Sequence, residues 1–425
     1  VERELMEQLR KIGAIGGAIS LALCWPLAVG QIGQNAITDG VAKLNNSSIQ
    51  AEIVEYDRGY LSSNVKTRLT VTDDNLKQQL ALDGLPSEFV VNSSVSHGLV
   101  SLNALSTFEN LETLPLTLTT STELNGNTDF NFELDQFNHQ GSGENGTSVS
   151  VTKSTLSGHA TVLGQVDYTL SVPSVQIDFE TGEEATLSNL KGTGSGQQAQ
   201  GYWLGSQSFT VERFLVSDST MQPFMTIENS QYDFESHLDE ETKRLRSNLK
   251  LGVENLETND GQVNNLNVDF EMSKLDSQSF EKIFEIYQSS PVLTQEDVSK
   301  IIPFIDILFA KGFDLSMNNM SLALGNGDFQ SNWLVSVPEG TENISNNPST
   351  ILPALTGNIH SSFSYELVEE YPFIREGIDE LIVMEMIKET DSGYEISAEL
   401  ENGNLVFENG QEIPLIALLM PVFVQ

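Results

Sequence analysis

The sequence predicts an α+β protein that is mainly antiparallel β, with large twisted or curved sheets, a few packing helices and one N-terminal transmembrane helix. Apolar and polar residues alternate with a period of two in one segment after another, and turn residues such as Asn125-Gly126-Asn127 separate these segments. Such alternation is typical of antiparallel sheets with one buried and one solvated face. The transmembrane prediction comes from the stretch 12–33, which contains no charged residue.

Residues 12–33 read IGAIGGAISLALCWPLAVGQIG. A helix over about 19 of these residues would be about 28 Å long, close to the thickness of a bilayer core. Arg10 and Lys11 precede it, which predicts that residues 1–11 form a short cytoplasmic tail. Gly16 and Gly17 are small enough to let two such helices pair, which would give a homodimer.

Two other interpretations of this stretch stay open. A signal peptide would be cleaved after the small residues Ala28-Val29-Gly30, although the apolar run is long for a signal. A lipoprotein signal would use Cys24, but Leu23 stands where a small residue is expected. The uncleaved anchor is the preferred interpretation.

The composition narrows the classes of function. The chain has 425 residues with 21 Lys and Arg against 60 Asp and Glu, a net charge of −39. Nucleic acid is therefore not an expected partner, because phosphate binding needs a basic surface. Cys24 is the only cysteine, which excludes an internal disulfide and a cysteine-based zinc site.

Beyond the anchor, the sequence predicts two β-rich periplasmic regions, residues 34–200 and 201–425. The glycine-rich run 191–201, KGTGSGQQAQG, is predicted to be a flexible loop that separates them. Helical periodicity predicts a short helix over 72–82, a helix pair within 273–313 broken at Ser289-Ser290-Pro291, and a helix within 369–389. The apolar end, 413–424, is predicted to be a last strand or a contact surface between copies.

Residues 49–72, IQAEIVEYDRGYLSSNVKTRLTVT, predict two strands joined by a bend at Gly59. A structural interpretation gives Gly59 a backbone angle that other residues avoid and pairs Arg58 with a carboxylate. A functional interpretation makes Arg58-Gly59-Tyr60 a docking element just outside the membrane. The structural interpretation is preferred.

This segment resembles the YdgA-type family, bacterial envelope proteins with one N-terminal membrane segment and a domain of unknown function. The resemblance rests on the order of motifs after the anchor: Tyr56, Arg58, Gly59, Tyr60, Ser62 and Ser63, then His97 and Gly98, then the strand-turn-strand of residues 394–414. Leu61 replaces an aromatic residue of the family pattern, and Leu99 replaces a proline. The resemblance implies a single-pass protein of the bacterial inner membrane with its bulk in the periplasm.

No motif for chemistry stands out, so no catalytic, cofactor-binding or metal-binding residue is predicted. The five histidines lack metal-ligand spacing, and no nucleophile elbow or phosphate loop is present. We therefore expect a non-enzymatic protein that binds or scaffolds, with a hydrophobic ligand such as a lipid, or an envelope protein, as its partner. Two alternatives are an envelope glycan or lipid hydrolase that uses paired carboxylates, and a structural or regulatory membrane dimer.

Overall fold

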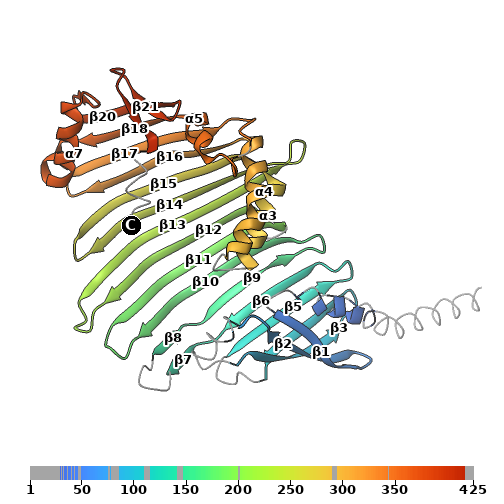
Figure 1. Cartoon of the computed structure of the whole chain (residues 1–425). Coiled ribbons are helices and arrows are strands. Elements are labelled where there is room, and N and C mark those ends of the chain that lie inside the picture. The colour runs from blue at the N-terminus through green and yellow to red at the C-terminus, as the bar shows by residue number, and fades with distance from the viewer. Residues whose placement is uncertain are drawn as a thin grey trace, which may run out of the picture. The chain divides into compact units, whose positions relative to one another are not determined.

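The computed structural model of the chain (Figure 1) describes residues 29, 31, 33–35, 37–39, 41–42, 44–45, 49–74, 77, 86–109, 115–140, 147–199, 202–289, 294–342 and 344–416. The chain divides into two compact units, Val1–Glu180 (unit 1) and Thr181–Gln425 (unit 2). The predicted membrane segment and the pairing residues Gly16 and Gly17 lie outside the described residues, except for Val29, Gln31 and Gly33 at its end. Among the helices that are described, none is long and apolar enough to cross a membrane.

Unit 1 is an up-and-down antiparallel sheet in which each strand pairs with its neighbour in sequence. In two places one long strand is interrupted, so that β6 continues as β7 and β8 continues as β9 in an unchanged register against their neighbours. The strands are β1 (Ile49–Arg58), β2 (Ser62–Val71), β3 (Glu88–His97), β4 (Ser101–Phe108), β5 (Leu116–Glu123), β6 (Thr128–Leu134), β7 (Phe137–Gln140), β8 (Ser148–Val151), β9 (Ser154–Ala160) and β10 (Gln165–Asp178).

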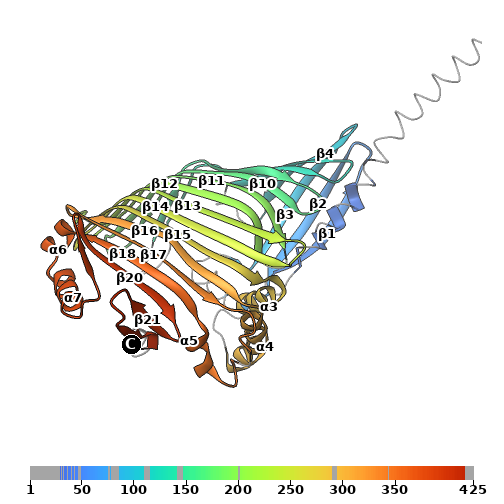
Figure 2. The ribbon, with the colours of Figure 1, turned by 90° about the horizontal axis from the view of Figure 1, so that it is seen from above.

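Unit 2 is also an up-and-down antiparallel sheet, whose strands β11 to β17 are long and which Figure 2 shows as an arch. Its strands are β11 (Glu184–Ala199), β12 (Tyr202–Ser217), β13 (Pro223–Asp239), β14 (Arg244–Thr258), β15 (Gly261–Asp276), β16 (Phe313–Leu324), β17 (Gly327–Val337), β18 (Thr356–Ser364), β19 (Lys388–Thr390), β20 (Gly393–Glu401), β21 (Asn404–Phe407) and β22 (Glu412–Pro414). The helices are α3 (Ser277–Ser289), α4 (Gln295–Lys311), α5 (Ile351–Ala354), α6 (Tyr365–Glu370) and α7 (Pro372–Val383), with a 3-10 turn at Pro348–Thr350.

The predicted antiparallel sheets and the predicted helix pair are confirmed. The pair is α3 and α4, and α4 begins with a capping box in which Thr294 and Asp297 satisfy each other's backbone amides. The helical pattern within 369–389 corresponds to α7, and β19 follows it. Of the short helix predicted over 72–82, only Asp74 and Lys77 are described as helical. The predicted last strand is described only as far as β22 and residue 416.

The prediction of a flexible loop at 191–201 is wrong. Residues up to Ala199 belong to β11, which pairs with β12 over almost its whole length. Glycine is needed here because the sheet is tight: a Cβ on Gly196 would lie 2.1 Å from the carbonyl oxygen of Leu204. The boundary that was predicted at residue 200 lies in sequence between β11 and β12, whereas the two compact units divide between Glu180 and Thr181.

Three strands of unit 2 contain an asparagine with a left-handed backbone conformation. At this asparagine the apolar positions of the strand change from odd to even residue numbers. In β13 the apolar positions are Met225 and Ile227 before Asn229, and Tyr232 and Phe234 after it, while the pairing register with β14 does not shift. Asn229 has φ 51°, and Asn189 and Asn265 on β11 and β15 have φ 56° and 52°. Asparagine tolerates this conformation better than other side chains. In β11, β13 and β15 the left-handed asparagine thus keeps the apolar side chains on one face of the bent sheet.

Replacing Asn229 with valine is expected to lower the free energy of unfolding by about 1–2 kcal/mol, because a β-branched residue is strained at positive φ. The matched control is Asn229→Gly, which loses the same hydrogen bond from Asn229 to Glu254 but accepts the backbone angle. Urea unfolding of the three proteins, followed by circular dichroism, measures the difference. Equal stabilities of the valine and glycine variants would contradict a role for the left-handed backbone.

Candidate functional site

The motif residues of the sequence analysis meet at one end of unit 1, where the β1–β2 turn lies beside the end of β3. Ser62 and Ser63 on β2 pair with Ser96 and Val95 on β3. The amide of His97 donates to the carbonyl of Leu61 at 2.8 Å. The structure therefore brings Tyr56, Ser63 and His97 together, although residues 64 to 96 separate the two halves of the motif in sequence.

Ser63 and His97 form a buried polar pair, since only 1% and 6% of their surfaces are exposed. Ser63 Oγ lies 2.8 Å from His97 Nε2, and His97 Nδ1 lies 3.2 Å from the carbonyl oxygen of Tyr60. A carbonyl only accepts, so Nδ1 carries the proton and Nε2 accepts from the serine hydroxyl. Ser63 also hydrogen-bonds Tyr56, whose pKa is raised chiefly by burial.

A hydroxyl beside an imidazole is the arrangement of a serine nucleophile with its base, but Ser63 is closed off from solvent. An exposed fraction of 1% leaves no room for a substrate carbonyl at Ser63 Oγ. The hydrogen bonds instead join the β1–β2 turn to the end of β3. We call the Ser63–His97 pair a brace, because its hydrogen bonds stabilise this end of the sheet.

Arg58 joins the same end of the sheet to the N-terminal helical residues. Its guanidinium donates to the side-chain oxygen of Gln31, and to that of Gln34 at 3.5 Å. On the same side Val29, which is completely buried, packs in a cluster with Val65, Val95 and Leu102. The motif thus holds the helical residues at the end of the uncharged stretch, among them Gln31, against the sheet.

Two details of the structural interpretation of this motif are wrong. Gly59 is not among the described residues with positive φ; its amide donates to the Ser62 carbonyl at 2.7 Å, and a Cβ would lie 2.8 Å from that same oxygen. Glycine is needed for close approach and not for an unusual backbone angle. Among the described residues, Arg58 binds the side chains of Gln31 and Gln34 in place of the predicted carboxylate.

A second candidate site is the apolar face of the unit 2 sheet, which we call the inner face. Neighbouring strands pair Tyr232 with Leu251, Leu251 with Val268, and Val268 with Met320. Aromatic rings also meet on it, at 6.3, 6.1 and 5.0 Å between centroids, in the pairs Phe209–Tyr232, Phe270–Trp333 and Phe329–Phe363. The opposite face carries charged pairs such as Arg246–Glu271 and Lys250–Asp269.

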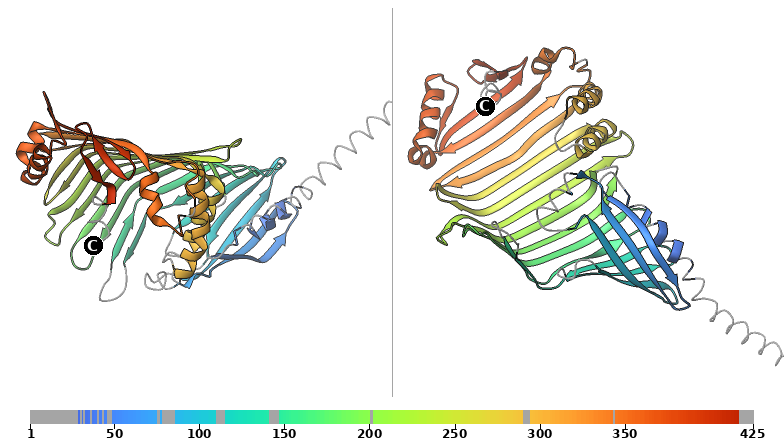
Figure 3. Two further views of the ribbon diagram at one scale, coloured as in Figure 1. Left: turned by 45° about the horizontal axis from the view of Figure 1, so that its top comes forward. Right: turned by 60° about the horizontal axis from the view of Figure 1, so that its bottom comes forward.

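Among the described helices, α3, α4 and α5 cover one end of the inner face. Leu245 and Leu275 are buried in a cluster against Phe280 of α3 and Leu308 of α4, and Figures 2 and 3 show α3, α4 and α5 on the inner side of the arch. Farther along the strands, Tyr232, Leu251, Val268, Phe270 and Trp333 are only half-buried. A contiguous apolar surface that stays partly exposed is typical of a binding site.

The sequence alternation predicted an apolar face, but not its continuity across the sheet. A strict period of two would place Ile227 and Phe234 on opposite faces. The signal that could have shown otherwise is the asparagine at which the apolar positions of β11, β13 and β15 change from one parity to the other.

The described carboxylates whose pKa is shifted do not resemble the acid of a glycosidase. No group of three or more metal-ligating side chains occurs in the part of the chain that the structure describes. Burial raises the pKa of Asp269 and Asp276, but hydrogen bonds outweigh it and both end below the ordinary range. Hydrogen bonds likewise lower the pKa values of Glu109, Asp218, Asp239 and Asp306. A glycosidase acid needs the opposite shift.

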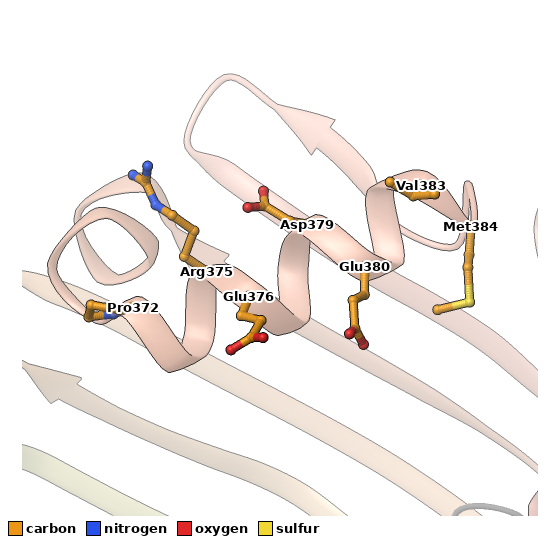
Figure 4. A pocket seen from close by; sticks show the side chains of 7 residues that line it. All are labelled: Pro372, Arg375, Glu376, Asp379, Glu380, Val383 and Met384. Atoms are coloured by element: carbon orange, nitrogen blue, oxygen red, sulfur yellow. The ribbon is translucent and has the colours of Figure 1, made fainter.

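Figure 4 shows a hollow on α7 that is lined by three carboxylates, those of Glu376, Asp379 and Glu380, and by Arg375. Every residue that lines it belongs to α7 or to Met384 just after the helix. A hollow lined by one helix has no second wall from which a carboxylate could face another across a sugar ring. The hollow gives the predicted hydrolase alternative no support.

Comparison with known proteins places the chain in a family. Residues 9–416 match the model of a family described as a bacterial protein of unknown function (DUF945), and the chain belongs to this family. No curated protein and no solved structure matches the chain.

Proposed function

We propose that this member of the DUF945 family is a non-enzymatic protein of the bacterial inner membrane whose β-rich part lies in the periplasm and binds the acyl chain of an envelope lipid on the inner face of unit 2. The observation that carries the proposal is the inner face itself. Its aliphatic and aromatic side chains run without a charge across neighbouring strands, from Phe209 on β12 to Phe363 on β18.

An acyl chain suits this surface better than a polar ligand does. The inner face offers few hydrogen-bonding side chains among its central residues, so a polar ligand would lose its hydration without replacement. Burying one CH₂ group contributes about 0.8 kcal/mol. A chain of about 14 such groups, with half its surface against the sheet, would gain about 5 kcal/mol, which corresponds to a dissociation constant on the order of 0.1 mM.

The membrane part of the proposal is supported by the sequence. Residues 12–28 contain no charged residue and follow Arg10 and Lys11, the arrangement of an anchor whose N-terminus stays in the cytoplasm. The net charge of −39 keeps the rest of the chain soluble beside the membrane. Pairing of anchors through Gly16 and Gly17 stays a prediction, and a dimer is compatible with lipid binding.

Photo-crosslinking tests the binding site. The full chain in detergent is incubated with a diazirine-bearing palmitic acid, and the labelled peptides are identified by mass spectrometry. We expect labels on the central strands of unit 2. Val268→Asp should weaken labelling about tenfold or more, because a carboxylate next to the acyl chain costs more than 1.4 kcal/mol.

The matched control is Asn267→Asp, which places the same carboxylate on the adjacent residue, on the other face of β15. It should label like the wild type. Equal loss in both variants, or labels confined to the polar face, would exclude the inner face as the acyl site.

A further inference from the structure

One end of the unit 1 sheet collects four of its turns, because consecutive strands of the meander alternate in direction. The turns β1–β2, β3–β4, β5–β6 and β9–β10 all lie at this end, which we call the tip edge. Neighbouring strands are about 4.8 Å apart, so the turns follow each other at roughly 10 Å and the tip edge extends over roughly 30 Å.

Three of these turns each expose two neighbouring apolar or aromatic residues. The exposed fractions are 42% and 59% for Tyr60 and Leu61, 71% and 69% for Leu99 and Val100, and 59% and 87% for Val162 and Leu163. The β5–β6 turn is polar instead, with Asn125-Gly126-Asn127. At the opposite ends of the strands β1 to β6 the described connecting residues include charged ones, among them Asp73, Asp74, Asp135 and Lys153.

Solvated turns normally carry polar residues, so paired apolar side chains at three of the four turns of the tip edge need a covering surface. The chain itself indicates which one. Val29 packs on Val65, Val95 and Leu102, and Arg58 binds Gln31, so the helical residues begin beside the tip edge. Immediately before Val29 the sequence is uncharged back to Ile12, which is the proposed membrane anchor.

We propose that Tyr60, Leu61, Leu99, Val100, Val162 and Leu163 contact the head-group and upper acyl region of the membrane that holds the anchor. This inference rests on the proposed membrane anchoring. Tyrosine is favoured at the membrane–water interface, and aliphatic side chains gain free energy by entering the acyl region. Because these contacts are spread along the tip edge, they would hold the unit 1 sheet in one orientation on the membrane surface and limit its rotation about the anchor.

The experiment uses the full chain with Cys24→Ala, so that single cysteines can be introduced at chosen sites and labelled with the fluorophore NBD. Leu99→Cys and Leu163→Cys report on the tip edge. Asn125→Cys in the polar turn and Asp135→Cys at the opposite end of the sheet are the controls. Each protein is reconstituted into phosphatidylcholine vesicles with and without nitroxide-labelled phosphatidylcholine, and flotation confirms that it is bound.

We expect the nitroxide lipid to quench NBD at positions 99 and 163 at least about twofold more than at position 135, because only the tip edge reaches the lipid. Quenching at position 125 should be intermediate. Protein that floats but shows equal quenching at 99, 163 and 135 would overturn the membrane contact and leave the anchor intact. Protein that does not float would overturn the anchor and the contact together.

A second set of variants separates membrane contact from folding. With NBD at position 100, the double substitution Leu99→Asp and Leu163→Asp should lower the quenching to the level of position 135. The control Leu105→Asp changes an equally apolar side chain, 50% exposed, in the middle of β4, and should leave quenching unchanged. Unchanged quenching in the double variant, with an unaltered circular dichroism spectrum, would also overturn the proposal.

Discussion

Replacing Asp276 with asparagine is expected to lower the free energy of unfolding by about 2–4 kcal/mol at pH 7. Asp276 is the last residue of β15 and is only 3% exposed. It accepts hydrogen bonds from the amide and hydroxyl of Ser279 at 3.0 and 2.7 Å, and it pairs with Lys311 at the end of α4. One carboxylate therefore ties the sheet to the start of α3 and the end of α4. An asparagine would keep the shape but lose the charge that Lys311 faces.

The pH dependence follows from the pKa of Asp276. Burial raises this pKa, but hydrogen bonds from Lys311 and Ser279 outweigh burial, so that it lies below its ordinary value of 3.8. A lowered pKa in the folded protein stabilises the fold above the pKa of the unfolded chain, and this stabilisation is lost as the pH falls. The difference between wild type and variant should thus be full at pH 7 and shrink below about pH 4.

Urea unfolding of both proteins at pH 7 and pH 3, followed by circular dichroism, measures this difference. The matched control is Asp314→Asn, whose partner Lys274 is 70% exposed at its side chain. That exposed pair should contribute at most about 1 kcal/mol. An equal loss in the two variants, or a loss that does not change with pH, would contradict the tie between sheet and helices.

The strands of the sheet could be predicted because the pattern that indicates a strand lies within a few consecutive residues. Alternation in segments such as Phe130-Phe132-Leu134 reports a half-buried strand, and Thr294 with Asp297 reports a helix start. The run 191–201 was misread because glycine is typical of loops, while here it serves the close approach of β11 and β12. Nothing within the run reveals that approach, since the contacting oxygen belongs to Leu204 on the next strand.

The candidate sites were predictable only in part. The motif residues Tyr56, Ser63 and His97 were singled out by their resemblance, but their meeting depends on the pairing of β2 with β3. The attachment of Arg58 to Gln31 and Gln34 joins positions 27 and 24 residues apart, and neither glutamine carries a sequence signal. The continuity of the inner face depends on the positive φ values of three asparagines. The sequence indicates these values only indirectly, through the change of the apolar positions from odd to even residue numbers.

Replacing His97 with leucine is expected to cost about 2–3 kcal/mol in the free energy of unfolding, because it removes both hydrogen bonds of a buried imidazole. These bonds join His97 to the hydroxyl of Ser63 and to the carbonyl of Tyr60. The matched control is His159→Leu: His159 also bonds one partner, Asp129 at 2.7 Å, but 38% of its side chain is exposed. That control should cost less than about 1 kcal/mol. Urea unfolding of the full chain measures both.

A double-mutant cycle with Ser63→Ala decides what the pair does. If the pair is a brace, Ser63→Ala already removes one of the hydrogen bonds that His97→Leu would remove, and the double variant should lose about 1 kcal/mol less than the two single variants together. Strictly additive losses would mean that the two side chains act separately, and the brace would be excluded.

The brace matters for the membrane proposal because the same turn holds Tyr60 and Leu61, and the neighbouring β3–β4 turn holds Leu99 and Val100. Loosening it should therefore also reduce the lipid quenching of a label at position 99, in a chain whose apolar tip residues are otherwise unchanged.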